Sequence, residues 1–353
     1  MLLTSYFLLL TSILLPRGVN HHGSLRVESE PPHFFPYRGI YLNYAAAMKI
    51  EKYLSHIKDN DINCVVVDFK EARGVVTYNT NVKLANDIGA TLPAINLEYL
   101  VKECKKEGIR LIGRIVVFQD SILAWYNKGE YSMRSHENKI WKDGHGRCWV
   151  NPCLKEVQLY NIEIAKDLAK RGVQEIQFDY IRFPSRSGAF KPYRIDCKSK
   201  EKVISQFLEL ARQELKPFDV VIAADVYGYA LWLPSLEDEG QNLKLMAPSL
   251  DVICPMLYPS HFHKHHEESQ NPRTREYNLI FKSVAKGESL IGESKFVPYI
   301  QGFNLRSPGF GPEYIANEIR ATRDSNVWGY IVWNSSSNYG ALWELLESGS
   351  PRR

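Results

Sequence analysis

Residues Cys64–Lys70 read CVVVDFK, a short β-branched run that ends in polar side chains. Seven more short runs of strand-forming residues occur along the chain, and amphipathic stretches separate them. They are Arg38–Tyr44, Arg110–Phe118, Glu175–Asp179, Val220–Asp225, Val252–Met256, Phe296–Gln301 and Gly329–Trp333. This alternation is typical of parallel βα units, and eight such strands close a (β/α)8 TIM barrel. We therefore predict an α/β fold with a single barrel domain over residues 36–347.

The stretches between these runs carry helix signals. Leu97–Lys106 has apolar residues at helical spacing and is followed by Gly108, a residue type that commonly ends helices. Pro152–Lys170 is preceded by Asn151, which favours a helix start at the Asn-Pro pair. The other predicted helices are Lys198–Leu215 and Pro312–Ser325.

Two connections are longer than their helices require. Residues 74–90, after the second strand, contain VVTYNT and NVKL, a pattern that favours a small hairpin. Residues 119–150, after the third strand, carry Trp125, Tyr126, Tyr131, Trp141 and Trp149. Both loops follow strand C-termini, where barrel enzymes build their active sites, so we expect both to border a site.

The charge balance and the N-terminus bear on location and partners. The 353 residues include 44 Lys and Arg against 40 Asp and Glu, a near balance that does not point to a nucleic-acid partner. The chain opens with MLLTSYFLLLTSILL, an apolar run typical of a secretory signal. We predict that residues 1–24 are a signal peptide and that the protein is periplasmic, bound to the cell envelope or secreted. The alternative is an uncleaved N-terminal membrane anchor.

The chain has six cysteines and no CxxC motif. Metal-binding spacing is absent, and free buried thiols are common in strands, which favours six free cysteines. The alternative is one disulfide between Cys148 and Cys153, because these two flank a Trp-Val-Asn-Pro turn.

Four histidines crowd the segment HFHKHH at residues 261–266. Lys, Glu and Ser surround them, which favours a solvated loop over a zinc site with fixed ligands. The sequence also contains no phosphate-binding glycine loop and no GxSxG nucleophile motif. We therefore expect neither a metal nor a cofactor.

Three aspartates lie near the C-terminal ends of their predicted strands and share one face. Side chains alternate along a strand, so Asp68, Asp179 and Asp225 are all expected to point into the barrel at its C-terminal rim. Carboxylates that converge there are typical of a catalytic site. The alternative for each is a helix cap or a structural ion pair.

Further polar and aromatic side chains lie near the same strand ends. Aromatic rings stack on sugars, although core packing is the alternative for about half of these. The predicted substrate-binding residues are Tyr41, Arg114, Arg182, Tyr227, Tyr258, His261, Gln301, Trp333 and Asn334.

A series of longer motifs carries a family resemblance. In order they read RGIYLNY, VVVDFKEARGVVTY, RLIGRIVVFQD, WVNP, EIQFDYIRFP, ADVYGY, CPMLYPSH and VWNSSSNY. From Arg38 to Tyr339 the chain resembles the bacterial "putative glycoside hydrolase" domain family, formerly catalogued as a domain of unknown function. This resemblance implies a barrel that acts on a polysaccharide. KEARG departs from the Lys-Asp pair that relatives tend to have, so no role is carried over to Glu71.

Glycosidic cleavage commonly uses two carboxyl groups. Strand seven ends in Gln301, which excludes the familiar arrangement with glutamates on strands four and seven. We predict Asp179 as the nucleophile or base, kept ionised by Arg114 and Arg182, and Asp225 as the acid/base. Neighbouring strands lie about 4.8 Å apart, which favours a close pair and retention of configuration. Asp68 is the reserve, with two alternatives: it holds a sugar hydroxyl, or it replaces Asp225 as the acid.

Two rival functions stay open at this point. One is a carbohydrate-binding or cell-envelope scaffold barrel without catalysis. The other is cleavage of a different bond in an envelope polymer by the same carboxylates. Because none of the three strand-end aspartates is missing, the sequence favours an enzyme with a carbohydrate substrate.

Overall fold

The structure is a computed structural model. It describes residues 35–185, 192–264, 266, 274–292 and 295–348. The predicted signal segment, residues 1–24, lies outside the described residues. Within them, no helix is both long enough and apolar enough to cross a membrane.

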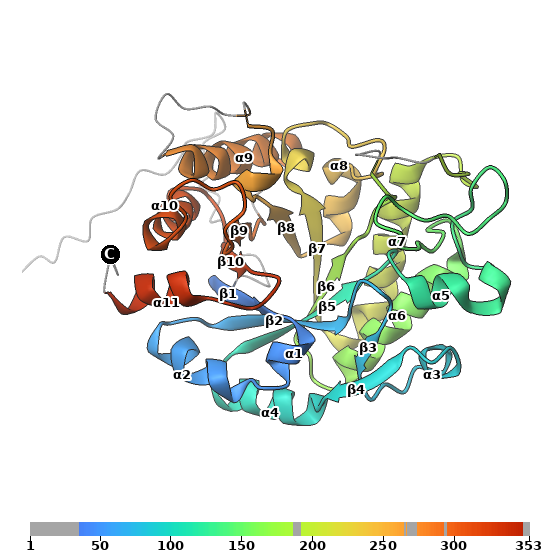
Figure 1. Cartoon of the computed structure of the whole chain (residues 1–353), viewed down its shortest axis with the longest axis horizontal. Coiled ribbons are helices and arrows are strands. Elements are labelled where there is room, and N and C mark those ends of the chain that lie inside the picture. Colours follow the sequence, from blue (N-terminus) through green and yellow to red (C-terminus); the bar gives the residue numbers. More distant parts are fainter. Residues whose placement is uncertain (1–34, 186–191, 265, 267–273, 293–294, 349–353) are drawn as a thin grey trace, which may run out of the picture. The chain divides into compact units, whose positions relative to one another are not determined.

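Eight parallel strands form a closed barrel (Figure 1). They run in the order β1-β10-β9-β8-β7-β6-β5-β2, and β1 also pairs with β2 to close the ring. Their bounds are β1 (Tyr37–Leu42), β2 (Cys64–Lys70), β5 (Arg110–Val116), β6 (Glu175–Asp179), β7 (Val221–Tyr227), β8 (Val252–Met256), β9 (Tyr299–Gln301) and β10 (Gly329–Trp333). The (β/α)8 prediction is confirmed. The seventh strand begins only at Tyr299, because Pro298 has no N–H to donate to the ladder.

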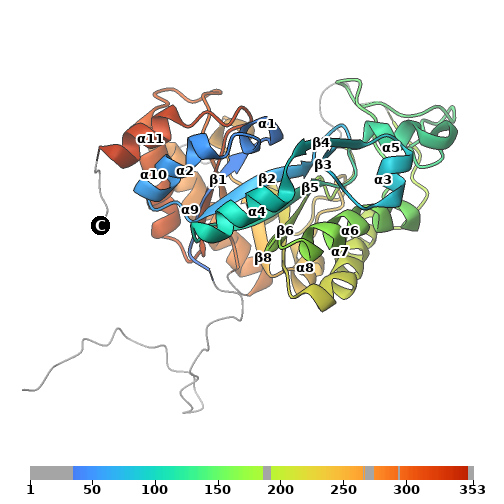
Figure 2. The same cartoon turned by 90° about the horizontal axis from the view of Figure 1, so that it is seen from below.

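Helices flank the strands on the outside of the barrel (Figure 2). Those predicted are α4 (Leu97–Lys106), α6 (Lys155–Lys170), α7 (Lys200–Leu215) and α10 (Pro312–Arg323). The others are α1 (Tyr44–Ala47), α2 (Glu51–Asp59), α3 (Lys83–Asp87), α5 (Ser121–Trp125), α8 (Leu243–Met246), α9 (Arg275–Ile291) and α11 (Gly340–Glu347). The predicted start of α6 at Asn151 is wrong, because the Asn151 side chain accepts from the backbone N of Cys153 and closes a turn before the helix.

The insertion after β2 differs from the predicted hairpin. β3 (Val76–Tyr78) pairs antiparallel with β2 and parallel with β4 (Thr91–Ile95), while the NVKL segment leads into α3. Asp167 of α6 accepts hydrogen bonds from the Thr80 hydroxyl at 2.8 Å and from the backbone N of Asn81 at 3.2 Å. These contacts turn the chain away from β3, so the hairpin prediction is wrong.

Buried apolar residues form two clusters, one on each side of the strands. The larger lies between strands and helices, and the smaller fills the barrel interior. The interior cluster includes Val66, Val221 and Ala223, which share the strand parity of the predicted aspartates. The predicted inward face is therefore the observed one.

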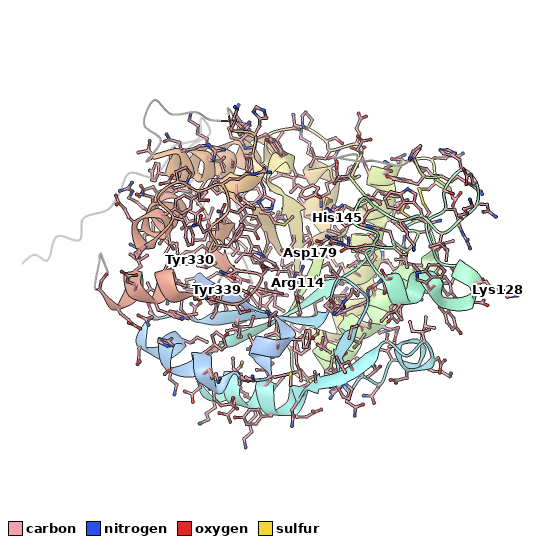
Figure 3. All side chains as sticks on the ribbon, viewed as in Figure 1. Arg114, Lys128, His145, Asp179, Tyr330 and Tyr339 are labelled. Carbon is pink, nitrogen blue, oxygen red and sulfur yellow. A yellow bond between two sulfur atoms is a disulfide. The ribbon has the colours of Figure 1, made fainter. Side chains whose placement is uncertain are left out.

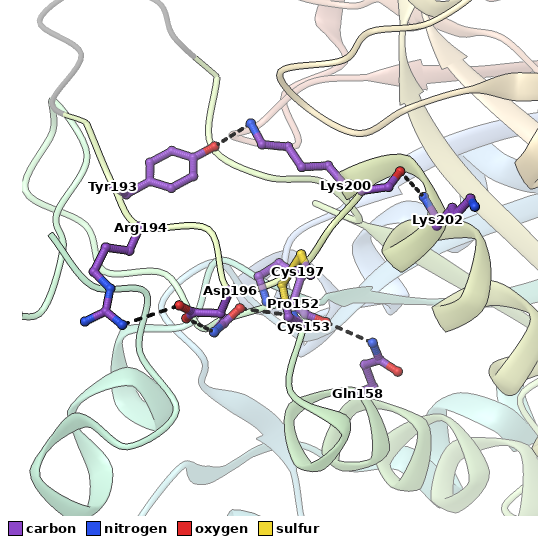
Figure 4. The surroundings of a disulfide bond; sticks show 11 residues. Pro152, Cys153, Gln158, Tyr193, Arg194, Asp196, Cys197, Lys200 and Lys202 are labelled. Carbon is purple, nitrogen blue, oxygen red and sulfur yellow. Dashed lines mark hydrogen bonds and ion pairs between the residues drawn. A yellow bond between two sulfur atoms is a disulfide. The ribbon is translucent and has the colours of Figure 1, made fainter. Parts of the chain in front are cut away.

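Cys153 and Cys197 form a disulfide, with Cα atoms 5.9 Å apart (Figure 4). It joins the segment before α6 to the loop before α7. Asn151 Nδ2 donates to Asp196 Oδ2 at 2.9 Å and holds the two segments together. Both sequence alternatives are therefore wrong: Cys148 is buried as a free thiol, and Cys153 pairs with a distant residue.

Candidate active site

Arg114 of β5 stands at the centre of the inward polar residues, beside Asp179 (Figure 3). Its Nε donates to Asp179 Oδ2 at 3.0 Å, and its Nη2 donates to the same oxygen. Its Nη1 donates to Asp68 Oδ1, and its Nε lies 3.8 Å from Asp225 Oδ2. One guanidinium thus holds the three predicted aspartates together.

Strand register explains this convergence. Asp68 of β2 lies beside Arg114, and Gln177 of β6 lies on the other side of Arg114. Gln177 in turn is registered with Ala223, two residues before Asp225. Inward side chains of neighbouring strands therefore form adjoining layers in the barrel, and their polar members meet near its C-terminal end.

Asp225 is held through Gln177. The Tyr299 hydroxyl donates to Gln177 Oε1 at 2.8 Å, which orients the amide so that Nε2 donates to Asp225 Oδ1 at 2.8 Å. Burial raises the pKa of Asp225 well above its ordinary value, and the charge of Asp179 raises it further, against the opposing effect of Arg114. Asp225 therefore keeps its proton at pH values where an ordinary aspartate is ionised.

Asp179 accepts hydrogen bonds at both oxygens. In addition to the two donors of Arg114, the backbone N of Tyr180 donates to its Oδ1 at 2.5 Å. Tyr180 has a φ of 52°, in the left-handed region that bulky residues rarely adopt. Such strained backbone occurs preferentially at functional sites, and here it accompanies an N–H donated to the carboxylate.

Asp68 has a different environment from the other two aspartates. Its Oδ2 accepts from the Tyr41 hydroxyl at 2.5 Å, and burial raises its pKa. The Tyr41 ring stacks on Trp333 with centroids 3.8 Å apart. Asp68 and Tyr41 do not line the cavity described below, so they support Arg114 from behind.

A cavity of about 610 Å³ opens beside this cluster. Eight predicted residues line it: Arg114, Asp179, Arg182, Asp225, Tyr227, Tyr258, His261 and Trp333. Arg182 lines the cavity without pairing with Asp179 among the described residues, so Arg114 alone supplies the guanidinium contacts to that carboxylate.

Gln301 and Asn334 lie elsewhere. Gln301 Nε2 donates to the backbone O of Phe303 at 2.8 Å, and its Oε1 accepts from the backbone N of Ser260 at 3.0 Å. Asn334 Nδ2 donates to the backbone O of Gly302. Both side chains hold loops in place and are not among the residues that line the cavity.

Most lining residues that the sequence reasoning missed come from the loop after β7 and the segment after β6. They include Ser185, Gly228, Tyr229, Leu233, Leu236 and Glu239. Loop residues have no strand parity, so no periodic signal identifies them. Gln177 and Tyr299 do share the inward parity, and that signal could have identified both.

The histidines of residues 261–266 have different surroundings. His261 lines the cavity, its Nδ1 lies 2.9 Å from Ser260 Oγ, and burial lowers its pKa. The ring of His266 packs on Trp232 with centroids 4.4 Å apart. His265 lies outside the described residues. In the part of the chain that the structure describes, no group of three His, Cys, Asp or Glu side chains could hold a metal ion.

Comparison with protein families agrees with this architecture. Residues 39–339 match a family model described as "Putative glycosyl hydrolase domain". A barrel whose aspartates converge on a cavity at its C-terminal end is the arrangement of a barrel enzyme. The chain belongs to this glycosyl hydrolase family.

Several solved structures are similar to this chain, and those with TM-scores above 0.5 show the same fold. A hypothetical protein from Ruminiclostridium thermocellum ATCC 27405 is 34% identical over 53% of this chain and 97% of that one, with a TM-score of 0.48. The glycoside hydrolase domain of PgaB (BpsB) from Bordetella bronchiseptica is 15% identical over 88% of this chain and 98% of that one, with a TM-score of 0.65. A class V chitinase from Pseudomonas fluorescens Pf-5 is 9% identical over 90% and 100%, with a TM-score of 0.55. No curated protein matches the sequence.

Proposed function

We propose that the protein cleaves a glycosidic bond in a polysaccharide or envelope glycan, with Asp179 and Asp225 as the catalytic pair. One observation carries this proposal: two carboxyl groups in different hydrogen-bonding environments line one cavity, and burial raises the pKa of one of them, Asp225. Asp179 accepts from N–H donors on both oxygens, as a carboxylate does, while Asp225 retains its proton. Pairs of carboxyl groups in such different environments divide the acid and base roles.

In the proposed reaction, Asp225 donates its proton to the glycosidic oxygen as the bond from that oxygen to the anomeric carbon breaks. Asp179 attacks the anomeric carbon and forms a glycosyl ester. A water molecule then gives its proton to Asp225, and its oxygen displaces Asp179 to release the sugar. Arg114 Nε lies 3.0 Å from Asp179 Oδ2 and 3.8 Å from Asp225 Oδ2, so the two carboxyl groups are close together, which favours this retaining course.

The remaining residues have positioning roles in this scheme. Gln177 occupies Oδ1 of Asp225, so the other oxygen, Oδ2, carries the proton. Tyr258, Tyr299 and Trp333 line the cavity with aromatic surface on which a sugar ring can stack. The volume of about 610 Å³ falls within the usual range for ligand sites.

The test compares the wild-type protein with Asp179→Asn and Asp225→Asn on purified envelope and storage polysaccharides, scoring new reducing ends. We expect product from the wild type and none from either folded variant. Tight glycan binding by all three proteins without any product would replace this proposal with the carbohydrate-binding scaffold.

We also propose that the protein is exported. The apolar opening of residues 1–24 motivates this, and the Cys153–Cys197 disulfide supports it because disulfides persist in oxidising compartments. Fractionation of an expressing bacterium and mass analysis of the purified N-terminus test it. Recovery of the full-length reduced chain in the cytoplasm would contradict it.

A further inference from the structure

Arg182 is surrounded by aromatic rings at the wall of the cavity. Its guanidinium carbon lies 4.8 Å from the ring centroids of Trp149, Tyr180 and Tyr227. The side chain is partly exposed and lines the cavity. Aromatic faces attract a cation, so the three rings hold the guanidinium in place.

The hydrogen bonding of Arg182 is far from complete. A guanidinium has five N–H donors. Among the described residues, Arg182 makes one hydrogen bond, from Nη1 to the backbone O of Phe183 at 3.2 Å, and it has no carboxylate partner. Ring faces are poor substitutes for oxygen acceptors, so a fixed positive charge faces the cavity with donors to spare.

The two arginines of the cavity therefore differ in what they can bind. Arg114 is engaged with three aspartates and has little capacity for a ligand. Beside Arg182, the hydroxyls of Ser185 and Tyr227 lie 3.0 Å apart and both residues line the cavity. A guanidinium fork with adjacent hydroxyls matches the oxygens of an anion.

We propose that Arg182 binds an oxyanion of the substrate, so that the protein acts on an acidic glycan that carries carboxylate or sulfate groups. This inference rests on the proposed function in one respect, namely that the cavity is the glycan site. Glu239 also lines the cavity without pairing with Arg182 among the described residues.

Affinity electrophoresis tests the inference without requiring catalysis. The gels contain acidic polysaccharides, their carboxyl-reduced forms, or sulfated polysaccharides and their desulfated forms, so that each pair differs in charge and keeps its linkages. Wild-type protein is compared with Arg182→Met, which removes the charge, and Arg182→Lys, which keeps the charge and loses the fork. Arg320→Met is the matched control, because Arg320 is an exposed arginine that lies over the Tyr277 ring.

We expect at least one acidic polysaccharide to retard the wild type and Arg320→Met, with little retardation by its neutral form. Arg182→Met weakens that binding by about tenfold or more, the effect of losing hydrogen bonds to a charged group, and Arg182→Lys gives an intermediate value. The carboxyl-reduced and desulfated gels identify which oxyanion is bound. Equal retardation by charged and neutral forms, no retardation by any acidic glycan, or unchanged binding by folded Arg182→Met would overturn the inference.

The proposed function is scored separately by reducing-end release. If no polysaccharide is cleaved but Arg182-dependent retardation is present, the hydrolase proposal fails and the anionic subsite stands. If a neutral glycan is cleaved equally by wild type and Arg182→Met, the hydrolase stands and the anionic subsite fails.

Discussion

The two ends of the barrel carry the same set of residue types in different proportions. β1 has Tyr37 and Tyr41, β5 has Arg110 and Arg114, and β6 has Glu175 and Asp179, each pair four residues apart. At the N-terminal end, Arg110 Nη1 and the Tyr37 hydroxyl donate to the same oxygen of Glu175, at 3.1 and 2.7 Å. At the C-terminal end, the corresponding residues are Tyr41, Arg114 and Asp179. Two further carboxyl groups, those of Asp68 and Asp225, lie beside Arg114 there.

The two clusters differ in the number of carboxyl groups for each guanidinium. The cluster at the N-terminal end has one guanidinium for one carboxyl group, whereas the cluster at the C-terminal end has one guanidinium for three carboxyl groups and borders a cavity. Burial raises the pKa of Glu175, but Asp225 experiences burial and the charge of Asp179 together. Burial, together with the charge of Asp179, therefore favours the protonated form of Asp225, and the comparison separates an ion pair from the proposed catalytic site.

The largest effect that tests this comparison is on activity. Asp225→Asn removes the proposed acid and lowers kcat by roughly 10²- to 10⁴-fold, and Asp179→Asn removes the proposed nucleophile with a loss at least as large. Glu175→Gln is the matched change at the N-terminal end of the barrel, and it leaves kcat unchanged. Reducing-end assays on folded proteins measure all three, and equal losses in the three variants would mean that the ends are not functionally distinct.

The next effect is on stability, and we expect it to be larger at the N-terminal end of the barrel than at the C-terminal end. Glu175→Gln leaves the guanidinium of Arg110 without its carboxylate, and we expect the free energy of unfolding to fall by about 2 kcal/mol. Urea denaturation measures the change. Asp225→Asn removes a group that is already protonated, so a loss as large as that of Glu175→Gln would contradict the assigned protonation state.

The pH dependence of the unfolding free energy tests the protonation of Asp225 directly. The pKa of Asp225 is raised on folding, so the folded state binds its proton more tightly than the unfolded state does. This stabilisation is complete below the unfolded pKa of about 3.9 and is lost as pH rises toward the raised folded pKa, by at most ~1.4 kcal/mol per pH unit. Asp225→Asn should flatten this part of the curve of unfolding free energy against pH.

Activity has a matching pH limb. The acid must be protonated, so kcat falls as pH rises above the pKa of Asp225 in the substrate complex. Glu175→Gln should leave this limb in place, because its carboxyl lies at the other end of the barrel. A limb that moves in Glu175→Gln would show that the two clusters are coupled.

The smallest expected effects come from the two tyrosines of β1. Tyr37→Phe removes a hydrogen bond to Glu175 and should lower the free energy of unfolding by about 1 kcal/mol without changing kcat. Tyr41→Phe removes the corresponding hydrogen bond to Asp68, loosens the support of Arg114 and lowers kcat by a few fold. Parallel urea denaturation and kinetics distinguish them, and a pure stability loss in Tyr41→Phe would make Asp68 a structural residue only.

The strand pattern accounts for what could be predicted of the site. Alternation of side chains placed Asp68, Asp179 and Asp225 on the inward face, and the structure joins all three to Arg114. The same pattern does not separate Asp68, which lies behind the cavity, from Asp225, which lines it. Both aspartates lie on the inward face two residues before the end of their strand, and their depth depends on the neighbours across the barrel.

Contacts between distant segments account for the errors. Cys153 has Cys148 five residues away in the sequence but pairs with Cys197, because the Asn151 turn meets the loop after β6. The hairpin expected in residues 74–90 is replaced by α3, because Asp167 from a later helix holds Thr80 and Asn81. Neither partner can be identified from local sequence.

The sequence by itself determined the eight strands, their inward faces and the family, because periodicity and strand-end residues are local properties of the chain. The tertiary structure alone decided the protonation of Asp225, the aromatic surroundings of Arg182 and the enclosure of the cavity by the loop after β7. These depend on burial and on distances between residues far apart in the sequence, which set the local dielectric and the strength of each charge interaction.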